Sequence, residues 1–100
     1  MQLHGINFDN DAIAAFCRRH DVLRFSLFGS IVTDKFGSGS DIDVLVEFPP
    51  RGGPGLLGFA AMEIELSTLF GREVHLHTPA MLGPLYRLEV EPKAMVQYAA

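Results

Sequence analysis

The chain has 100 residues, of which 48% are hydrophobic, ten are glycine and six are proline, so we expect residues 1–100 to fold as a single globular domain. Its formal net charge of -4 at pH 7 argues against a broad basic face and therefore against direct binding of nucleic acid. The N-terminus lacks a signal-peptide pattern and no stretch reaches the ~18 apolar residues of a membrane span, which predicts a cytoplasmic protein without a membrane partner.

A helix and a strand are predicted before residue 29. Apolar residues recur at three- and four-residue spacing between about residues 10 and 20, after possible capping residues at 9–11. Cys17, the only cysteine, shares this apolar spacing and is expected to pack rather than react. The run from residue 23 to 28 is predicted to be a buried strand that stops at Gly29.

The clearest strand of the sequence follows a glycine- and serine-rich segment. Residues 30–40 suit a short helical turn and then a loop, and residues 41–48 suit a strand that ends at Pro49. Because strand side chains alternate, one face should carry Ile42, Val44, Val46 and Phe48, and the other Asp41, Asp43, Leu45 and Glu47.

The second half is predicted to hold a loop, a long helix, a strand and short helices. Residues 49–55 are too rich in proline and glycine for regular structure. Residues 56–70 carry an apolar stripe typical of a helix, and Gly71 is a plausible C-terminal stop. Residues 73–77 suit a short strand, and one or two short helices should follow it. The apolar anchors of that last segment are Leu82, Leu85, Leu88, Met95, Val96 and Tyr98.

Two residue pairs carry the chemistry. Gly29 and Ser30 leave a buried strand and offer a close backbone approach, a hydroxyl and N–H donors, which together suit a phosphate, although most Gly-Ser pairs only make turns. Asp41 and Asp43 project from one strand face, which suits either a solvated strand end or a divalent cation such as Mg²⁺. Their spacing alone leaves both interpretations open.

Taken together, the two pairs resemble the signature of the nucleotidyltransferase superfamily that includes polymerase beta. Gly29-Ser30 is followed after ten residues by Asp41-x-Asp43, with hydrophobic strands on both sides. The wider sequence is most similar to the minimal nucleotidyltransferase (MNT) proteins, through LFGS at 27–30, SDIDVLVEF at 40–48, FGREV at 70–74 and TP at 78–79. The resemblance runs from about residue 22 to residue 78.

The resemblance implies an α/β (α+β) fold of the polymerase beta type, a small mixed sheet flanked by helices. Gly29 and Ser30 would then bind the phosphates of ATP across a cleft from Asp41 and Asp43, which would hold Mg²⁺. Two Mg²⁺ ions would neutralise the triphosphate and orient it for attack by a hydroxyl. The resemblance thus implies a Mg²⁺-dependent adenylyltransferase.

The resemblance also implies a biological setting and a partner. Proteins of this family act as antitoxins in toxin–antitoxin pairs, where the partner is a HEPN-domain ribonuclease, and some transfer AMP from ATP to a tyrosine of that toxin. A hetero-oligomer with the toxin is therefore expected. A stand-alone transferase acting on a small hydroxylated substrate or on RNA is an alternative that the acidic composition disfavours.

One position departs from the family pattern. Catalytic members usually carry a third carboxylate where this chain has His75, which removes a negative charge and suits Zn²⁺ or Mn²⁺ better than Mg²⁺. Three substitutes for the third carboxylate remain open. Glu73 on the same strand face could replace it, His75 itself could act as the base, or two carboxylates could suffice. Alternatively His75 is only an exposed strand residue, and the chain is a catalytically weakened antitoxin that neutralises the toxin by direct binding. Lys35 and Arg51 are expected in the two loops nearest the cleft.

Overall fold

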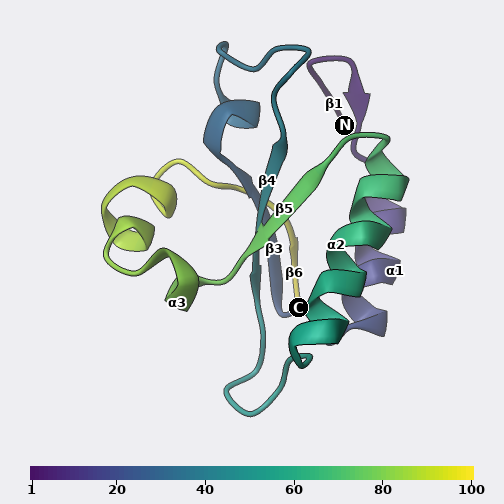
Figure 1. Ribbon diagram of the computed structural model, residues 1–100, viewed down its shortest axis with the longest axis vertical. Helices are drawn as coiled ribbons and strands as arrows, with labels where there is room; N and C mark the ends of the chain where they lie inside the picture. The colour runs from purple at the N-terminus through teal and green to yellow at the C-terminus, as the bar shows by residue number, and fades with distance from the viewer.

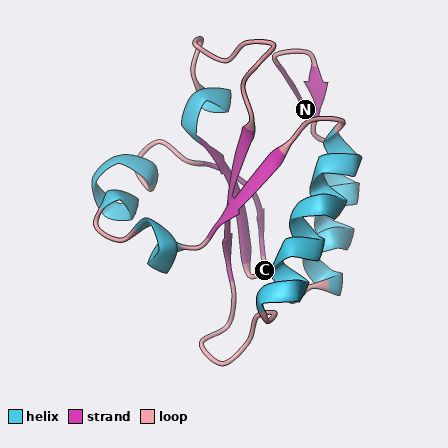
Figure 2. Cartoon of the chain, in the orientation of Figure 1, coloured by secondary structure: helices cyan, strands magenta, loops and turns pink.

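The computed structural model describes all 100 residues, and its centre is a four-stranded sheet with the strand order β5-β4-β3-β6. Figures 1 and 2 show this sheet between two long helices on one side and short helical turns on the other. The elements in chain order are β1 (Gln2–Leu3), β2 (Ile6–Asn7), α1 (Asn10–Arg19), β3 (Arg24–Phe28), η1 (Gly29–Val32), β4 (Ile42–Glu47), α2 (Leu56–Phe70), β5 (Val74–His77), α3 (Pro79–Leu82), η2 (Tyr86–Val90) and β6 (Met95–Ala99).

The sheet is mixed, as the sequence predicted. β3 pairs antiparallel with both β4 and β6, whereas β4 and β5 are parallel. Parallel neighbours need a crossover, and α2 supplies it between β4 and β5. The carboxyl end of β3 therefore lies beside the start of β4, where Phe28 is opposite Asp43.

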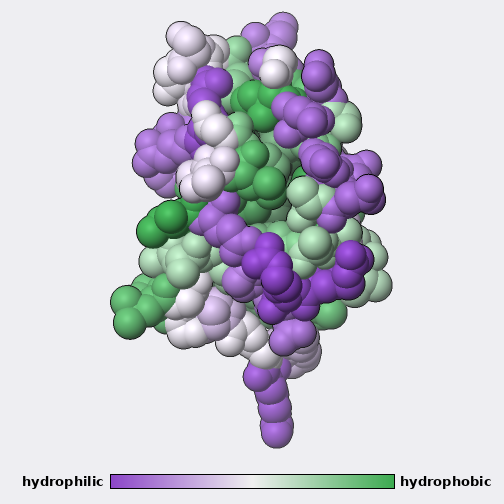
Figure 3. Space-filling model, turned by 90° about the vertical axis from the view of Figure 1, so that its right-hand side faces the viewer, coloured by the Kyte–Doolittle hydropathy of each residue, from purple (hydrophilic) through white to green (hydrophobic).

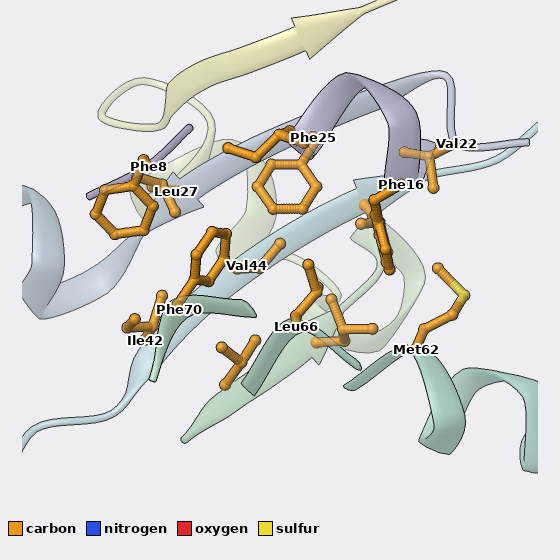
Figure 4. Packing of buried hydrophobic residues seen from close by; sticks show 14 of the residues in the cluster. Phe8, Phe16, Val22, Phe25, Leu27, Ile42, Val44, Met62, Leu66 and Phe70 are labelled. Atoms are coloured by element: carbon orange, nitrogen blue, oxygen red, sulfur yellow. The ribbon is translucent and has the colours of Figure 1, made fainter. Parts of the chain in front are cut away.

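The hydrophobic core lies between the sheet and helices α1 and α2. Figure 4 shows side chains of both helices converging on those of β3 and β4. Phe8, which follows the N-terminal hairpin, reaches the same core and packs against Phe70 of α2 with ring centroids 4.9 Å apart. Its largest fully buried members are Phe8, Phe16, Phe25, Ile13, Leu27, Ile31, Ile42, Met62, Leu66, Leu76, Val44 and Val46.

Both long helices begin and end as the sequence predicted. The Asp9 side chain caps α1 by accepting hydrogen bonds from the amides of Asp11 (2.9 Å) and Ala12 (3.2 Å). α2 ends at Gly71, whose φ of 67° is the left-handed conformation that glycine adopts without strain. The predicted burial of Cys17 is also confirmed.

Helix α2 also closes the outer edge of β5 through two polar side chains. The amide of Leu76 donates to Glu63 Oε2 at 2.7 Å, and the amide of Val74 donates to Ser67 Oγ at 2.9 Å. Unpaired N–H groups on an edge strand invite pairing with another chain. These two contacts remove that liability and fix β5 beside β4.

The outward surface of the two long helices mixes polar and apolar residues, as Figure 3 shows. Leu56, Leu57 and Ile64 of α2 are strongly exposed there. None of the helices is long and apolar enough to span a membrane.

The ends of the chain differ from the prediction. The last segment was expected to form only short helices, but Met95, Val96 and Tyr98 belong to strand β6, which pairs with the edge of β3. Residues 95–99 form a strand because they pair with β3, which is distant in sequence, and their local periodicity does not predict a strand. α3 and η2 are the short helices that were expected, while the N-terminal β1–β2 hairpin was not predicted.

Candidate functional site

Gly29 lies directly against Asp43 where β3 meets β4. Gly29 has a φ of 76°, and a Cβ atom at this position would lie only 2.6 Å from Asp43 Oδ2. Both the backbone conformation and the lack of space require glycine here. Ser30 follows as the second residue of η1, so the structure brings the Gly-Ser pair and the second aspartate together as the sequence predicted.

Asp41 and Asp43 lie on the sheet face that α1 and α2 leave uncovered. Ile42 between them is fully buried and points into the core, which turns both carboxylates the other way. Their side chains are 45% and 33% exposed, respectively, so the oxygens remain accessible to a ligand. The alternation predicted for this strand is confirmed.

A clamp formed by Arg72 fixes the loop that leads into Asp41. The Arg72 Nε donates to the carbonyl of Ser40 at 2.9 Å, and a terminal nitrogen donates to the carbonyl of Gly37. The guanidinium also lies 4.6 Å from the ring centroid of Phe36, a cation–π contact. Arg72 thus ties three points of the loop to the start of β5, a role that the sequence did not suggest.

Each aspartate is paired with a histidine of β5. His75 Nε2 lies 3.0 Å from Asp41 Oδ2, and His77 Nε2 lies 3.3 Å from Asp43 Oδ1. The two pairs run side by side because β4 and β5 are parallel, with Asp43 opposite His75 in the register. Glu73 Oε1 lies 3.7 Å from His75 Nε2 on the outer side.

The electrostatic surroundings favour the charged form of His75. Partial burial by itself lowers the pKa of this imidazole. The hydrogen bond with Asp41 and the negative charges of Asp41, Glu73 and Glu63 outweigh that effect and raise the pKa above its usual value. The acidic neighbours of His75 therefore favour its protonated form.

The donor set fits divalent cations. One ligand atom each of Asp41, Glu73 and His75 lies within 4.8 Å of the others. Asp43 adds an accessible carboxylate beside Gly29, and carboxylate oxygens are the ligands that Mg²⁺ prefers. The residues named from sequence, Asp41, Asp43 and His75, thus share one face and one end of the sheet, and Glu73 joins them.

A cavity of about 530 Å³ opens beside Gly29. Its volume falls within the range typical of small-molecule sites. It lies between η1 and η2, and its lining residues are Phe28, Gly29, Val32, Thr33, Glu89, Val90 and Lys93.

The structure contradicts the prediction for one of the two loop cations, Arg51. Arg51, expected near the cleft, lies in the loop after β4, at the opposite end of that strand from Asp41 (Figure 1). Lys35 does not line the cavity, whereas Lys93 does. No sequence motif marks Lys93, because only the return of the chain along β6 places it beside Gly29.

Comparisons with known proteins agree with this geometry. The sequence profile described as nucleotidyltransferase domain matches residues 10–95. A protein of Methanocaldococcus jannaschii, provisionally named a protein adenylyltransferase, is 38% identical over 83 residues, which cover 83% of this chain and 87% of that protein.

Two solved structures have the same fold. One, provisionally named a minimal nucleotidyltransferase, is 30% identical with a TM-score of 0.71, and the match covers 86% of each chain. The other is a chain of a toxin–antitoxin crystal structure with AMP-PNP; it is 16% identical with a TM-score of 0.75, and the match covers 93% of this chain and 75% of that one.

Proposed function

The chain belongs to the nucleotidyltransferase domain family, and we propose that it transfers AMP from ATP to a hydroxyl group of a partner protein. The family membership confirms the nucleotidyltransferase class expected from the sequence. The observation that carries the proposal is the contact of Gly29 with Asp43, which joins a phosphate-binding turn to a cation-binding carboxylate. The name of the 38% identical relative, a protein adenylyltransferase, supports a protein acceptor.

In the proposed reaction the acceptor hydroxyl loses its proton and attacks the α-phosphorus of ATP, the bond to the β-phosphate breaks and pyrophosphate leaves. The residues of this chain position the nucleotide for that step. The backbone of Gly29 and the amide and hydroxyl of Ser30 bind the triphosphate, since no side chain caps the start of η1. Asp41 and Asp43 would hold Mg²⁺, which would supply charge neutralisation at the phosphates. The Asp43 carboxylate occupies the space that a side chain at position 29 would need, so glycine at this position allows the carboxylate to lie beside the phosphate-binding turn.

We assign the cavity beside Gly29 to the nucleoside part of ATP. It adjoins the phosphate-binding turn, and the ring of Phe28 and the side chains of Val32 and Val90 give it apolar surface. Lys93 at its edge supplies a cation for the phosphates. Lys93 lies outside the Gly29-Ser30 and Asp41-x-Asp43 motifs. Substituting it therefore tests the assignment of the cavity without changing those motifs.

We propose a HEPN-domain toxin as the partner and a tyrosine of that toxin as the acceptor, in a hetero-oligomer. The toxin–antitoxin context of a solved structure with the same fold supports this setting, and its AMP-PNP supports ATP as the nucleotide. No tyrosine of this chain lies among the residues that line the cavity, which is compatible with an acceptor supplied by a partner.

The test is the intact mass of the partner after incubation with this protein, ATP and Mg²⁺. The partner is the product of a neighbouring reading frame with HEPN features. We expect its mass to rise by whole AMP units, and Asp43→Asn to abolish the increase. Asp21→Asn is the matched control, because Asp21 is exposed, lies outside the site and has a φ of 57° that asparagine also tolerates. An unchanged partner mass with the wild-type protein would contradict the proposal.

A second candidate is neutralisation of the toxin by direct binding without catalysis. The observation that favours it is His75, which occupies the position of a third carboxylate and pairs with Asp41. Under this alternative the Asp41→Asn, Asp43→Asn double variant still inhibits the toxin at equimolar ratio, and the partner mass does not change. Loss of inhibition in the double variant would instead favour the enzyme.

A further inference from the structure

We propose that Asp41, Glu73 and His75 form a binding site for one transition-metal ion, which this chain fills with Zn²⁺ or Mn²⁺ in preference to Mg²⁺ and without nucleotide. The inference rests on the proposed function only in treating Asp41 as a metal ligand. It adds Glu73 and an imidazole nitrogen to the site and changes the metal that the site selects.

The three side chains come from two adjoining strand ends. The amide of Ile42 donates to the carbonyl of Glu73 at 2.9 Å, which fixes the residue after Asp41 against the residue before β5. His75 projects from β5 on the same face, with its Nε2 3.0 Å from Asp41 Oδ2 and 3.7 Å from Glu73 Oε1. The backbone pairing therefore places the three side chains next to one another.

The donor chemistry selects the metal. Two carboxylates and one imidazole offer two hard oxygens and one nitrogen of intermediate softness. Nitrogen ligands favour Zn²⁺ and, less strongly, Mn²⁺, whereas Mg²⁺ prefers oxygen ligands and retains its water. A cation bound between the carboxylates would also replace the hydrogen bond that His75 now makes with Asp41.

The site is open enough to admit an ion and to leave places for water. The side chains of Asp41, His75 and Glu73 are 45%, 42% and 68% exposed, respectively. Three protein ligands with remaining positions open is the arrangement of metal sites that also bind a substrate or water. Asp41 is shared with the proposed Mg²⁺ site, so an ion held here lies at the edge of the nucleotide site.

The neighbouring histidine provides an internal comparison. His77 lies two residues further along β5 and pairs with Asp43, and its ring packs edge-on against Phe28 at 5.2 Å between centroids. It is not among the three residues whose ligand atoms lie within 4.8 Å of one another. The proposal therefore predicts that His75 binds the metal ion and that His77, on the same strand, does not.

The test is calorimetric titration of the nucleotide-free protein with Zn²⁺, Mn²⁺ and Mg²⁺, together with the visible absorption of bound Co²⁺. We expect the affinity order Zn²⁺, Mn²⁺, Mg²⁺, and a ligand-field band of Co²⁺ that reports nitrogen coordination. His75→Ala and Glu73→Gln should each weaken Zn²⁺ binding by about tenfold or more, and His75→Ala should remove the nitrogen signature. His77→Gln and His20→Gln should leave Zn²⁺ affinity within about twofold.

One exchange reverses the expected selectivity. His75→Asp replaces the nitrogen by a carboxylate oxygen, so it should weaken Zn²⁺ binding and strengthen Mg²⁺ binding. Equal Zn²⁺ affinity in wild type and His75→Ala, or an equal loss in His77→Gln, would overturn the proposal. Because no nucleotide is present, this result is independent of AMP transfer, which the partner mass tests separately.

Discussion

His75 Nε2 lies 3.0 Å from Asp41 Oδ2, so a side chain of β5 is hydrogen-bonded to the first aspartate of the proposed nucleotide site. The parallel pairing of β4 and β5 creates this contact, and it repeats one step along the strands in His77 and Asp43. Two histidines thus stabilise two neighbouring carboxylates that would otherwise repel each other. Metal binding to these carboxylates would compete with their contacts to His75 and His77.

Gly29→Ala should disrupt the site more than it disrupts the fold. The added Cβ would lie 2.6 Å from Asp43 Oδ2 and must displace that carboxylate, and alanine at a φ of 76° costs about 1–2 kcal/mol of stability. We expect the affinity for ATP with Mg²⁺ to fall by about tenfold or more in calorimetric titration.

Gly71→Ala is the matched control for this prediction. Gly71 has a similar φ of 67°, and a Cβ there would have no atom within 4 Å. It should lower the melting temperature by a similar amount but leave ATP affinity unchanged. Equal ATP affinity in the two variants would contradict the role of the contact between Gly29 and Asp43.

Arg72→Ala should release the loop that precedes Asp41. The variant loses the hydrogen bonds to the carbonyls of Ser40 and Gly37 and the contact with the Phe36 ring. We expect faster amide hydrogen exchange across residues 36–41 and weaker ATP binding.

Arg72→Lys separates charge from geometry in this clamp. A single ammonium group cannot reproduce the guanidinium fork, so the lysine variant should recover only part of the protection. Arg51→Ala, in the loop at the other end of β4, should change neither measurement. Wild-type exchange rates in Arg72→Ala would show that the loop is held by other contacts.

Cys17 should be inert to thiol reagents in the folded protein. Its side chain is fully buried in α1, and this burial, only partly offset by the charge of Arg18, raises the pKa of the thiol to about 12. About one thiol in ten thousand is then ionised at pH 8, and that thiolate is shielded from reagent. Iodoacetamide should label Cys17 only after addition of denaturant, and labelling of the native protein at the rate of a free thiol would refute the burial.

Glu65 should make stability depend on pH through the contact between α2 and α1. Its carboxylate accepts hydrogen bonds from Arg19, the last residue of α1, and from His20, which follows it, and the bond from Arg19 is the largest cause of a lowered Glu65 pKa. A lowered carboxyl pKa stabilises the fold fully above the usual value of 4.5, and this contribution disappears as pH falls through the lower folded pKa.

Glu65→Gln tests this pH dependence. Because the pair is largely exposed, the variant should lower the melting temperature by only about 1–4 °C at pH 7. The difference between wild type and variant should shrink steadily below pH 4.5. A difference that stays constant or grows toward low pH would contradict the predicted direction.

The local elements of this fold are readable from sequence. The apolar spacing of α1 and α2, the Asp9 cap and the Gly71 stop are local signals, and each is confirmed. β6 is different, because Met95, Val96 and Tyr98 have a spacing compatible with a helix and become a strand only by pairing with β3. The hairpin of β1 and β2 has strands of two residues, too short for any periodic pattern.

In the site, too, some features follow from local sequence and others from non-local pairing. Strand alternation predicted that Asp41 and Asp43 share a face, but the side-chain contact between Asp41 and His75 depends on how β5 aligns with β4. Lys93 lines the cavity only because the chain passes Gly29 on its way into β6. Arg72 contributes to the site only through its contacts with a loop that is distant in sequence. Motifs therefore indicated the residues that we propose bear the chemistry, and tertiary pairing determined their side-chain partners.

The most direct test of the central claim is an NMR titration of the ¹⁵N-labelled protein with ATP and Mg²⁺. We predict that the largest amide shift changes fall on Gly29, Ser30 and residues 41–43, with further changes at Lys93. Asp43→Asn should abolish them and Asp21→Asn should preserve them. Saturable binding with its largest changes on another surface, or no shift change at ATP concentrations typical of cells, would contradict the assignment of this face as the nucleotide site.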